Sequence, residues 1–434
     1  MNSIYAVAGN PIFHSRSPVM FNAALRELSL DGVYIRLAAS SGEEVATTMR
    51  AIGLDGMNIT SPFKADIIPY LDEVDRDAQV IGSVNTVLHK DGRLRGFNTD
   101  VDGVLGALAQ AGFEGKGKSA VVLGAGGAAR AAAVALLSAG AKVTITNRTD
   151  RNARQAAERV GCDQVPLEEV GRTLKGAHLL IGAVSTHDRV IDRQHIHKGL
   201  TVLDANYSKP TALVQDAASV GAKVIDGREW LLAQAVPVFE RFTGNAAPVQ
   251  TMRQVLMKTR RDGRTNIALI GFMGSGKTVV AEAIGAKTGM TVIDIDTRIE
   301  EKAGTSIAEI FEKSGQEAFR RMEIEEIDGL RSMSNTIVSC GGGAVTRRPN
   351  VRVLRNNCLT VWLWAGIEAS LARIGATGTR PLLHGQSREQ ASALLAERRF
   401  LYASACDLVI NTEGKSPEEI ATRIYHETYN TLHG

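Results

Sequence analysis

The sequence predicts an α/β protein with largely parallel sheets, and three observations lead to that prediction. Short runs rich in β-branched residues, such as YAVAG, SAVVL, NIALI and TVWLW, are typical of buried strands. Stretches of helical character separate these runs, for example residues 18–30 and 127–140. Two glycine-rich loops each follow a predicted strand and open a predicted helix. This alternation favours βαβ units, and the loops predict two nucleotide sites.

The composition is that of a soluble globular protein with more than one domain. The chain has 434 residues, of which 44% are hydrophobic and 22% are charged. A net charge of +3 argues against a nucleic-acid partner or a membrane surface. The four cysteines lie far apart and include no CxxC pair, which is typical of reduced thiols. We therefore expect a cytoplasmic enzyme, and its oligomeric state stays open.

The clearest break along the chain is the charged stretch RRDGRT at 260–265, which separates a helical run from the strand NIALI. A softer boundary falls near residue 100, before the helix that leads to SAVVL. The expected parts are a substrate-binding domain at 1–100, a Rossmann NADP-binding domain with return helices at 101–259, a linker at 260–265 and a P-loop kinase-like α/β domain of three layers at 266–434.

Residues 271–278, GFMGSGKT, meet the pattern G-x-x-x-x-G-K-[ST] that holds phosphates. Glycines let backbone N–H groups converge on phosphate oxygens, and the lysine adds positive charge at the outer phosphates. The threonine hydroxyl can bind Mg²⁺, and the following helix presents its positive end to the anion. The expected ATP site comprises Gly271, Gly274, Ser275, Gly276, Lys277 and Thr278.

The second loop, GAGGAA at 124–129, fits the dinucleotide pattern G-x-G-x-x-[GA] between a strand and an alanine-rich helix. A close helix–strand turn without a ligand is the alternative. The next strand ends in Asn147, where an NAD enzyme usually has an acidic residue, and Arg148 follows. A neutral residue with an arginine suits a 2′-phosphate and favours NADP(H). The expected residues are Gly124, Ala125, Gly126, Gly127, Ala128, Asn147, Arg148 and Thr149.

Four stretches near the N-terminus are rich in hydroxyl and amide groups: GNPIFHSRSP, NITSPFK, GSVNT and GFNTD. Each could be an ordinary turn, but together they suit a small polyhydroxylated substrate. With GAGGAA, NRT, DANYSKPTAL and LLAQAVPVFERFTG, they closely resemble shikimate dehydrogenase from residue 2 to about residue 258. The family's motif order is kept.

The resemblance implies that Lys64 and Asp100 form the catalytic pair. Reduction of a ketone needs a hydride from NADPH and a proton for the developing alkoxide, which a lysine beside a carboxylate can deliver. It also implies that Gly227 lies at the NADP site. The shikimate contacts implied in this half are Ser15, Ser17, Asn58, Thr60, Lys64, Asn85, Asp100, Tyr207 and Gln234.

Three positions depart from that family's pattern. The family often has histidine at Phe21, usually has asparagine at Gly182 and commonly has methionine at Trp230. The last two positions fall near the expected nicotinamide site.

The C-terminal part has its own set of candidate residues. Asp294 and Asp296 alternate at the end of a predicted strand, and a period of two would put both carboxylates on one side. One could hold Mg²⁺ and the other could orient a hydroxyl nucleophile. The CGGGA stretch permits close backbone approach. Arg320, Arg380 and Arg398 could bind carboxylate or phosphoryl groups.

The C-terminal part resembles shikimate kinase over about 266–428. The resemblance rests on the order of its motifs, which are the P-loop, DID, GQEAFR, GGG, RPLL and the arginine four residues before Tyr402. By this resemblance, Lys277, Thr278 and Asp294 serve MgATP. Arg373 would lie near the adenine, and Arg380 would belong to a lid over 376–390. Lys277 and Asp296 would be catalytic. The implied shikimate contacts here are Asp296, Arg320, Gly342, Gly343 and Arg398.

The two resemblances imply consecutive reactions on one molecule. NADPH would reduce 3-dehydroshikimate to shikimate, and ATP would phosphorylate shikimate to shikimate 3-phosphate. Two alternatives stay open: one half could be a regulatory ligand-binding module, or the first half could be a quinate/shikimate oxidase. The presence of every named catalytic side chain argues against the former, and the neutral Asn147 argues against the latter.

Overall fold

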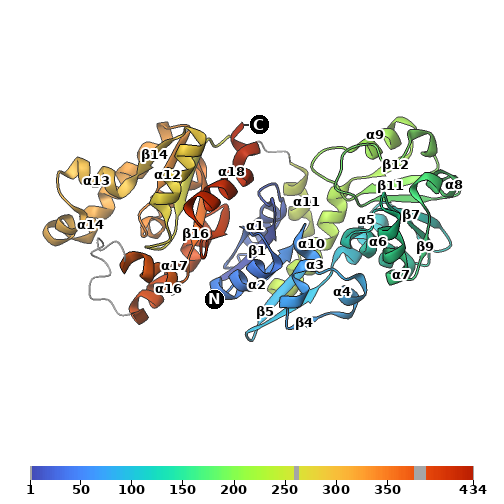
Figure 1. Ribbon diagram of the computed structural model, residues 1–434, viewed down its shortest axis with the longest axis horizontal. Coiled ribbons are helices and arrows are strands. Elements are labelled where there is room, and N and C mark those ends of the chain that lie inside the picture. Colours follow the sequence, from blue (N-terminus) through green and yellow to red (C-terminus); the bar gives the residue numbers. More distant parts are fainter. Residues whose placement is uncertain (1, 259–262, 376–387, 434) are drawn as a thin grey trace. The chain divides into compact units, whose positions relative to one another are not determined.

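The computed structural model describes residues 2–258, 263–375 and 388–433 (Figure 1). It divides into two compact units: unit 1 is Met1–Pro18, Leu30–Met57 and Thr259–Gly434, and unit 2 is Val19–Ser29 and Asn58–Lys258. These units group the first strands with the C-terminal part, whereas the sequence places a boundary at 260–265. Three linker residues, 260–262, lie outside the described residues. No helix in the described ranges is long and apolar enough to cross a membrane.

Unit 2 contains a six-stranded sheet with the order β12-β11-β10-β7-β8-β9. Neighbouring strands in it are parallel. The order reverses between β7 and β10, which is the switch point where dinucleotides bind in Rossmann folds. The predicted fold class is confirmed here. The strands are β7 (Ser119–Leu123), β8 (Lys142–Thr146), β9 (Asp163–Gln164), β10 (Leu179–Gly182), β11 (Thr201–Asp204) and β12 (Lys223–Ile225).

Helices cover this sheet, and the alanine-rich α6 packs against β7, β8 and β10. Its buried alanines, including Ala129, Ala132 and Ala133, share one core with Val122 and Ile145. Small side chains let the helix approach the strands closely, which places its first turn at the switch point. The helices are α5 (Asp100–Gln110), α6 (Gly127–Ser138), α7 (Asp150–Val160), α8 (Val170–Leu174), α9 (Ala212–Ser219), α10 (Gly227–Thr243) and α11 (Val249–Met257).

A smaller set of elements in unit 2 carries three of the four polar stretches found in the sequence, and GNPIFHSRSP lies in unit 1. Strands β5 (Thr86–Lys90) and β6 (Arg93–Phe97) form an antiparallel hairpin. Its turn is Asp91-Gly92, and both residues have positive φ, as a two-residue hairpin loop requires. The other elements are α3 (Phe63–Asp66), β4 (Glu73–Val74) and α4 (Arg76–Ile81), while α1 (Ser17–Glu27) and β3 (Gly56–Ile59) run across the unit boundary.

Unit 1 contains the parallel strand order β14-β15-β13-β16-β17-β2-β1. The P-loop follows the central strand β13. The C-terminal strands are β13 (Asn266–Ile270), β14 (Thr291–Asp294), β15 (Thr336–Ser339), β16 (Cys358–Trp364) and β17 (Leu408–Asn411). The N-terminal strands are β1 (Ser3–Gly9) and β2 (Gly32–Ala38).

The helices of unit 1 complete the predicted P-loop α/β arrangement. Helix α12, which opens at the P-loop, lies beside the C-terminal helix α18 (Figure 1). The helices are α2 (Gly42–Ile52), α12 (Lys277–Thr288), α13 (Ile295–Ala303), α14 (Ile307–Asp328), α15 (Arg348–Asn357), α16 (Ile367–Gly375), α17 (Arg388–Ala405) and α18 (Pro417–His433).

The N-terminal and C-terminal strands meet at a β2–β17 seam, which the sequence did not predict. We use this name for the contacts of β2, α2 and the loop at residues 11–16 with β17 and α18. Leu408, Val409 and Ile410 pair with residues 36–38 of β2, and all three are fully buried. Because β17 covers β2, this strand is not an edge that could pair with another chain.

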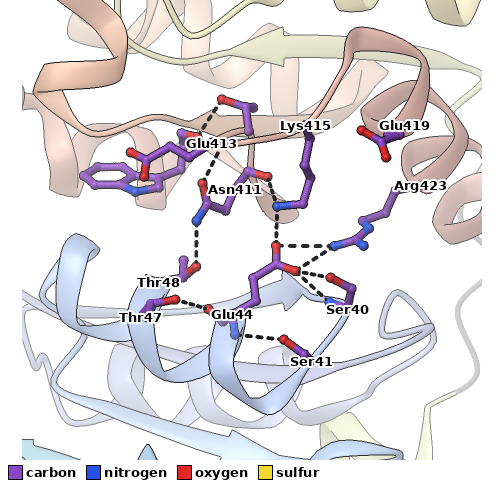
Figure 2. A network of polar contacts seen from close by, with 12 residues as sticks. Ser40, Ser41, Glu44, Thr47, Thr48, Asn411, Glu413, Lys415, Glu419 and Arg423 are labelled. Atoms are coloured by element: carbon purple, nitrogen blue, oxygen red, sulfur yellow. Dashed lines mark hydrogen bonds and ion pairs between the residues drawn. The ribbon is translucent and has the colours of Figure 1, made fainter.

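A polar network crosses the seam beside this pairing (Figure 2). The Glu44 carboxylate of α2 is 2.9 Å from the Lys415 ammonium and 3.3 Å from the Arg423 guanidinium. The Asn411 amide of β17 donates to the Thr48 hydroxyl at 3.0 Å. Only a tenth of the Glu44 side chain is exposed. Charge pairs with this degree of burial contribute more than exposed ones, because water screens them less.

We expect Glu44→Gln to destabilise unit 1 at pH 7 by about 1–3 kcal/mol, because it removes one partner of a half-buried charge cluster. Although burial raises the pKa of Glu44, bonds from Ser40 and Lys415 and the Arg423 charge lower it below the ordinary value. Stability from this carboxylate is therefore present above about pH 4.3 and is lost as pH falls through the folded pKa. Urea unfolding at several pH values measures it.

The matched control is Glu43→Gln, because Glu43 is the exposed neighbour in the same first helical turn. Both glutamates feel the helix dipole, so the difference between the two variants isolates the ion pairs. The gap between Glu44→Gln and the wild type should shrink at acid pH. A gap that stays constant from pH 7 down to pH 3 would show that the charge pairs contribute nothing.

Candidate functional site

The structure joins Lys64 to Asp100 in a short ion pair. Lys64 lies in the short helix α3, Asp100 is the first residue of α5, and the lysine Nζ is 2.6 Å from Asp100 Oδ2. Asp100 is 2% exposed, whereas the lysine side chain keeps about a fifth of its surface. Asn98 Oδ1 accepts the backbone N–H of Asp100 at 2.9 Å, which fixes the start of α5. A buried carboxylate thus holds and orients a partly accessible ammonium group.

Three predicted amide residues form a connected cluster in the same unit. Asn85 Nδ2 lies 3.3 Å from Gln234 Oε1 on α10 and 3.2 Å from the Thr99 hydroxyl. Asn58, on β3, donates to the Asn85 carbonyl at 3.1 Å. Half-buried Thr60 lies at the start of α3, where its carbonyl accepts the Phe63 N–H. Such a cluster offers both donors and acceptors to a hydroxylated ligand.

Ser15 and Ser17 belong to unit 1 and are both buried, at 5% and 8% exposure. The Ser17 N–H donates to Ser15 Oγ at 3.4 Å, so the two residues are direct neighbours at the start of α1. Tyr207 lies in the loop after β11 and is half-buried. A Cβ at Gly227 would lie 2.6 Å from the Asn206 carbonyl, so only glycine fits against this loop.

The GAGGAA loop has the geometry of a phosphate cradle. Gly124 has φ of +124°, and a Cβ there would lie 2.6 Å from the Ala183 carbonyl. Gly126 precedes α6 without a capping side chain, so the free N–H groups of the first turn stay available to an anion. A Cβ at Gly127 would meet Ser83 Oγ at 2.3 Å and Lys64 Cδ at 4.0 Å. The loop therefore lies directly beside the lysine of the ion pair.

Asn147, Arg148 and Thr149 follow strand β8, which pairs with the strand β7 that leads into the glycine loop. Arg148 is exposed, and among the described residues it makes no hydrogen bond or ion pair. Asn147 Nδ2 donates to the Thr149 carbonyl at 3.1 Å and holds the turn. Arg154 on α7 is 2.8 Å from Asp150, with which it forms an exposed ion pair. The Arg148 guanidinium is thus accessible at the end of the strand beside the glycine loop.

Arg130 is a residue that the sequence reasoning missed. Its guanidinium donates to the Ala125 carbonyl in the glycine loop at 2.7 Å, and to the carbonyls of Ile81 and Gly82 at the end of α4. Burial lowers the pKa of Arg130, and the nearby Arg159 charge adds to this. Its position directly after GAGGAA was the available signal. Arg130 ties the nucleotide loop to the end of α4.

The three departures from the family pattern lie in packed positions. Phe21 contacts the rings of Phe239 and Phe242, with centroids 6.0 and 6.2 Å apart. Trp230 is 4% exposed and packs over Gly103. A Cβ at Gly182 would already lie 2.8 Å from the nearest carbon of Leu213. A side chain at position 182 would therefore need the Leu213 and Asp204 side chains to shift.

The P-loop glycines adopt conformations that other residues avoid. Gly271, Gly274 and Gly276 have φ of +151°, +74° and +91°. A Cβ at Gly274 would lie 2.4 Å from the Ser370 carbonyl, so the loop has no room for a side chain there. Lys277 is 4% exposed and donates to the carbonyls of Gly271 and Phe272 at 3.1 and 2.9 Å. Ser275 is fully buried within the loop.

The prediction that Asp294 and Asp296 alternate on one strand is wrong. Strand β14 ends at Asp294, which caps α13 by accepting the N–H groups of Asp296 and Thr297. Asp296 is therefore helical. A short polar side chain that can accept two backbone N–H groups favours a helix start over another strand residue. Thr278 Oγ1 donates to Asp294 Oδ2 at 2.8 Å, so the two expected Mg²⁺ ligands are in contact.

Two predicted shikimate residues of the C-terminal part, Asp296 and Arg320, lie against the glycine triplet at 341–343. A Cβ at Gly341 would lie 2.9 Å from Asp296 Oδ1, and one at Gly343 would lie 2.1 Å from Arg320. Arg320 is 3% exposed and pairs with the fully buried Glu323 at 2.8 Å. Burial raises the pKa of Glu323, although the Arg320 charge opposes the rise. Sequence reasoning missed Glu323, but its spacing of three from Arg320 on a helix was a usable signal.

Two further arginines contact the loops. Arg398 donates to the Gly342 carbonyl at 3.2 Å, as does the Tyr402 hydroxyl at 2.5 Å. Burial raises the pKa of Tyr402 to about 12, so this hydroxyl stays protonated at neutral pH. Arg373 donates to the Gly274 carbonyl of the P-loop at 3.3 Å. Arg380 and most of the expected lid lie outside the described residues. Among those described, no three His, Cys, Asp or Glu side chains cluster as a metal site.

Comparisons with known proteins identify the two parts. Residues 7–87 match the family model of the shikimate dehydrogenase substrate binding domain, and residues 107–214 match that of shikimate / quinate 5-dehydrogenase. A shikimate dehydrogenase (NADP(+)) of Halobacterium salinarum is 40% identical over 262 residues, which are 58% of this chain and 98% of that relative. This chain belongs to the shikimate dehydrogenase family.

The dehydrogenase part also resembles solved structures of that family. The shikimate dehydrogenase of Aquifex aeolicus has a TM-score of 0.56 and 35% identity, over 59% of this chain and 98% of that one. The Thermus thermophilus enzyme in complex with NADP(H) and shikimate has a TM-score of 0.55 and 35% identity, over 58% of this chain and 98% of that one.

Residues 273–429 match the shikimate kinase family model. The chain therefore unites shikimate dehydrogenase domains and a shikimate kinase domain in a bifunctional enzyme of the shikimate pathway.

Proposed function

We propose that this chain reduces 3-dehydroshikimate to shikimate with NADPH and then phosphorylates shikimate with ATP to shikimate 3-phosphate. One observation carries the proposal: each of the two nucleotide loops lies in contact with the charged residues that its reaction needs. Gly127 of the first loop lies beside Lys64 of the Lys64–Asp100 pair. In the second loop, Thr278 follows Lys277 and donates its hydroxyl to the Asp294 carboxylate.

For the reduction, NADPH supplies the hydride. Lys64 donates a proton to the oxygen that becomes the new hydroxyl, and its charge stabilises the developing alkoxide. Asp100 orients the lysine ammonium group, because the buried carboxylate lies 2.6 Å from it. We assign shikimate binding to the amide cluster of Asn58, Asn85 and Gln234. Ser15, Ser17, Thr60 and Tyr207 are further predicted contacts for the same substrate.

For the phosphorylation, ATP supplies the phosphoryl group. Lys277 would move its ammonium group from the loop carbonyls to the outer phosphates, and Thr278 with Asp294 would hold Mg²⁺. Asp296 would accept the proton of the attacking hydroxyl. Arg320 and Arg398 would bind the shikimate carboxylate beside Gly342 and Gly343, and Arg373 would lie near the adenine. Arg380 stays a predicted phosphate contact. Glu323 would keep the Arg320 fork in place.

The test is an omission series with the full-length chain. The protein receives 3-dehydroshikimate, NADPH and MgATP, and each component is then left out in turn. NADPH absorbance follows the reduction, and ADP release follows the phosphorylation. Omitting ATP should stop only ADP release, whereas omitting NADPH should stop both signals until shikimate is added. A half that never turns over would instead be a regulatory module. Oxidation of quinate with NAD⁺ at a higher rate would identify a catabolic oxidase.

Arg148→Ala is expected to raise the Michaelis constant for NADPH about ten- to hundredfold. The physical reason is the loss of a charge-assisted contact to the 2′-phosphate, worth about 1.5–3 kcal/mol. Arg148 has no other partner among the described residues, so its removal costs no internal bond. Steady-state kinetics with NADPH and with NADH measure the effect.

NADH is the internal control, because it lacks the 2′-phosphate and should be little affected. Arg148→Lys keeps the charge without the planar fork and should give an intermediate value. Equal losses with both cofactors would make Arg148 a structural residue and remove the main support for the choice of NADP.

A further inference from the structure

The loop at residues 11–16 is held by a side chain from the far end of the sequence. Glu427, on α18, accepts the N–H groups of Ile12 and Phe13 through its Oε2 atom, at 2.7 and 2.9 Å. Glu427 is 6% exposed and Ile12 is fully buried. This loop leads directly to Ser15 and Ser17. The kinase domain therefore supplies a bond to the segment that carries two predicted substrate contacts of the dehydrogenase.

Arg36 forms a second tie between the same segments. Its guanidinium donates to the Ser15 carbonyl at 2.8 Å and to the Asp407 carbonyl at 3.3 Å. Asp407 directly precedes β17, the kinase strand that pairs with β2. The guanidinium also lies 5.1 Å from the ring centroid of Phe13. The backbone on both sides of the loop is thus fixed by contacts that depend on the β2–β17 seam.

The burial of these bonds makes them costly to lose. Without the Glu427 carboxylate, the buried N–H group of Ile12 and the partly buried N–H group of Phe13 would lose this acceptor. A buried donor that makes no hydrogen bond is destabilising. Burial raises the pKa of Glu427, while the two N–H groups and the nearby arginine charges oppose the rise. Burying a carboxylate costs desolvation free energy, so a buried carboxylate needs hydrogen-bond donors around it. The loop N–H groups are those partners.

We propose that the last strand and helix of the kinase domain form a working part of the dehydrogenase: Glu427 holds the loop at residues 11–16 in the conformation that presents Ser15 and Ser17 to the substrate. The inference rests on the proposed function, because that function assigns substrate binding to the two serines. Glu427 acts here as a positioning residue. The kinase domain would then have a second role in this chain, because it would fix the conformation of a substrate-binding loop of the dehydrogenase.

The test is Glu427→Ala in the full-length chain. We expect the Michaelis constant for 3-dehydroshikimate to rise about five- to fiftyfold, which is the scale of losing one or two hydrogen bonds. The kcat of reduction should stay within about threefold, because Lys64 and Asp100 are untouched. The Michaelis constant for NADPH and the rate of shikimate phosphorylation should not change. A merely structural role would instead lower all of these activities together.

Three further variants make the result specific. Glu427→Gln keeps an oxygen that can accept both bonds and should restore most of the affinity. Glu427→Asp keeps the charge but shortens the reach, so it should behave like the alanine variant, and it carries the test if that variant does not fold. Glu418→Ala removes an exposed glutamate of the same helix and should have no effect.

Each contrary outcome has its own meaning. An unchanged Michaelis constant for 3-dehydroshikimate in folded Glu427→Ala or Glu427→Asp, beside an active wild type, would overturn this inference alone. A wild-type chain that does not reduce 3-dehydroshikimate at all would refute the proposed function, and the inference with it. Equal losses in Glu418→Ala would show that the effect belongs to the helix as a whole and would also overturn the inference.

Discussion

Lys64→Ala is expected to abolish the reduction of 3-dehydroshikimate, with a fall in kcat of at least about a thousandfold. The variant loses the proton donor, which contributes about 10²–10⁴ in rate, and it also loses the charge that stabilises the alkoxide. Asp100 would then be a buried carboxylate without the cation that lies 2.6 Å away in the wild type. Phosphorylation of added shikimate should stay nearly intact, because the kinase residues are on other elements. Coupled assays of both reactions measure the effect.

Two control variants accompany that experiment. Lys64→Met keeps much of the side-chain volume and should be as inactive as the alanine variant, since the charge is what matters. Lys90→Ala removes an exposed lysine of strand β5 and should leave both activities unchanged. Circular dichroism confirms that each variant is folded. Loss of both activities in folded Lys64→Ala would contradict two chemically independent sites.

Lys277→Ala is expected to have the reverse effect, lowering phosphorylation by at least about a thousandfold while the reduction continues. A P-loop lysine stabilises the charge on the transferring phosphoryl group. In the structure the ammonium group rests on the carbonyls of Gly271 and Phe272. Removing it also removes a positive charge at the outer phosphates, so ATP affinity should fall together with the rate.

The matched control is Lys287→Ala, an exposed lysine in the last turn of the same helix. It lies at the far end of α12 from the P-loop, and both activities should persist. ADP release with added shikimate reports the kinase, and NADPH absorbance reports the dehydrogenase. Phosphorylation at the wild-type rate in Lys277→Ala would remove the P-loop from the mechanism. The β2–β17 seam implies that the two parts fold together. The two lysine variants, Lys64→Ala and Lys277→Ala, test whether their reactions are nevertheless independent.

Local patterns in the sequence determined the fold class and both nucleotide loops. Gly124, Gly271 and Gly276 stand where positive φ or a nearby carbonyl excludes a side chain, so their spacing carries the loop geometry directly. The neutral Asn147 followed by Arg148 predicted the choice of cofactor for a similar reason, because the residues after the second strand face the ribose in such folds. These features depend on neighbours within a few residues.

Only the tertiary structure decided the rest. Lys64 and Asp100 are 36 residues apart; composition and periodicity do not pair them, the resemblance to shikimate dehydrogenase predicted the pair, and the structure gives its geometry. Asp296 is helical because Asp294 caps the helix before it, an outcome that a strand period of two could not show. Glu427 bonds to Ile12 across 415 residues, and β17 pairs with β2 in the same way. Contacts between distant segments depend on which surfaces meet when the chain folds, and that information is spread over the whole sequence rather than held in any motif.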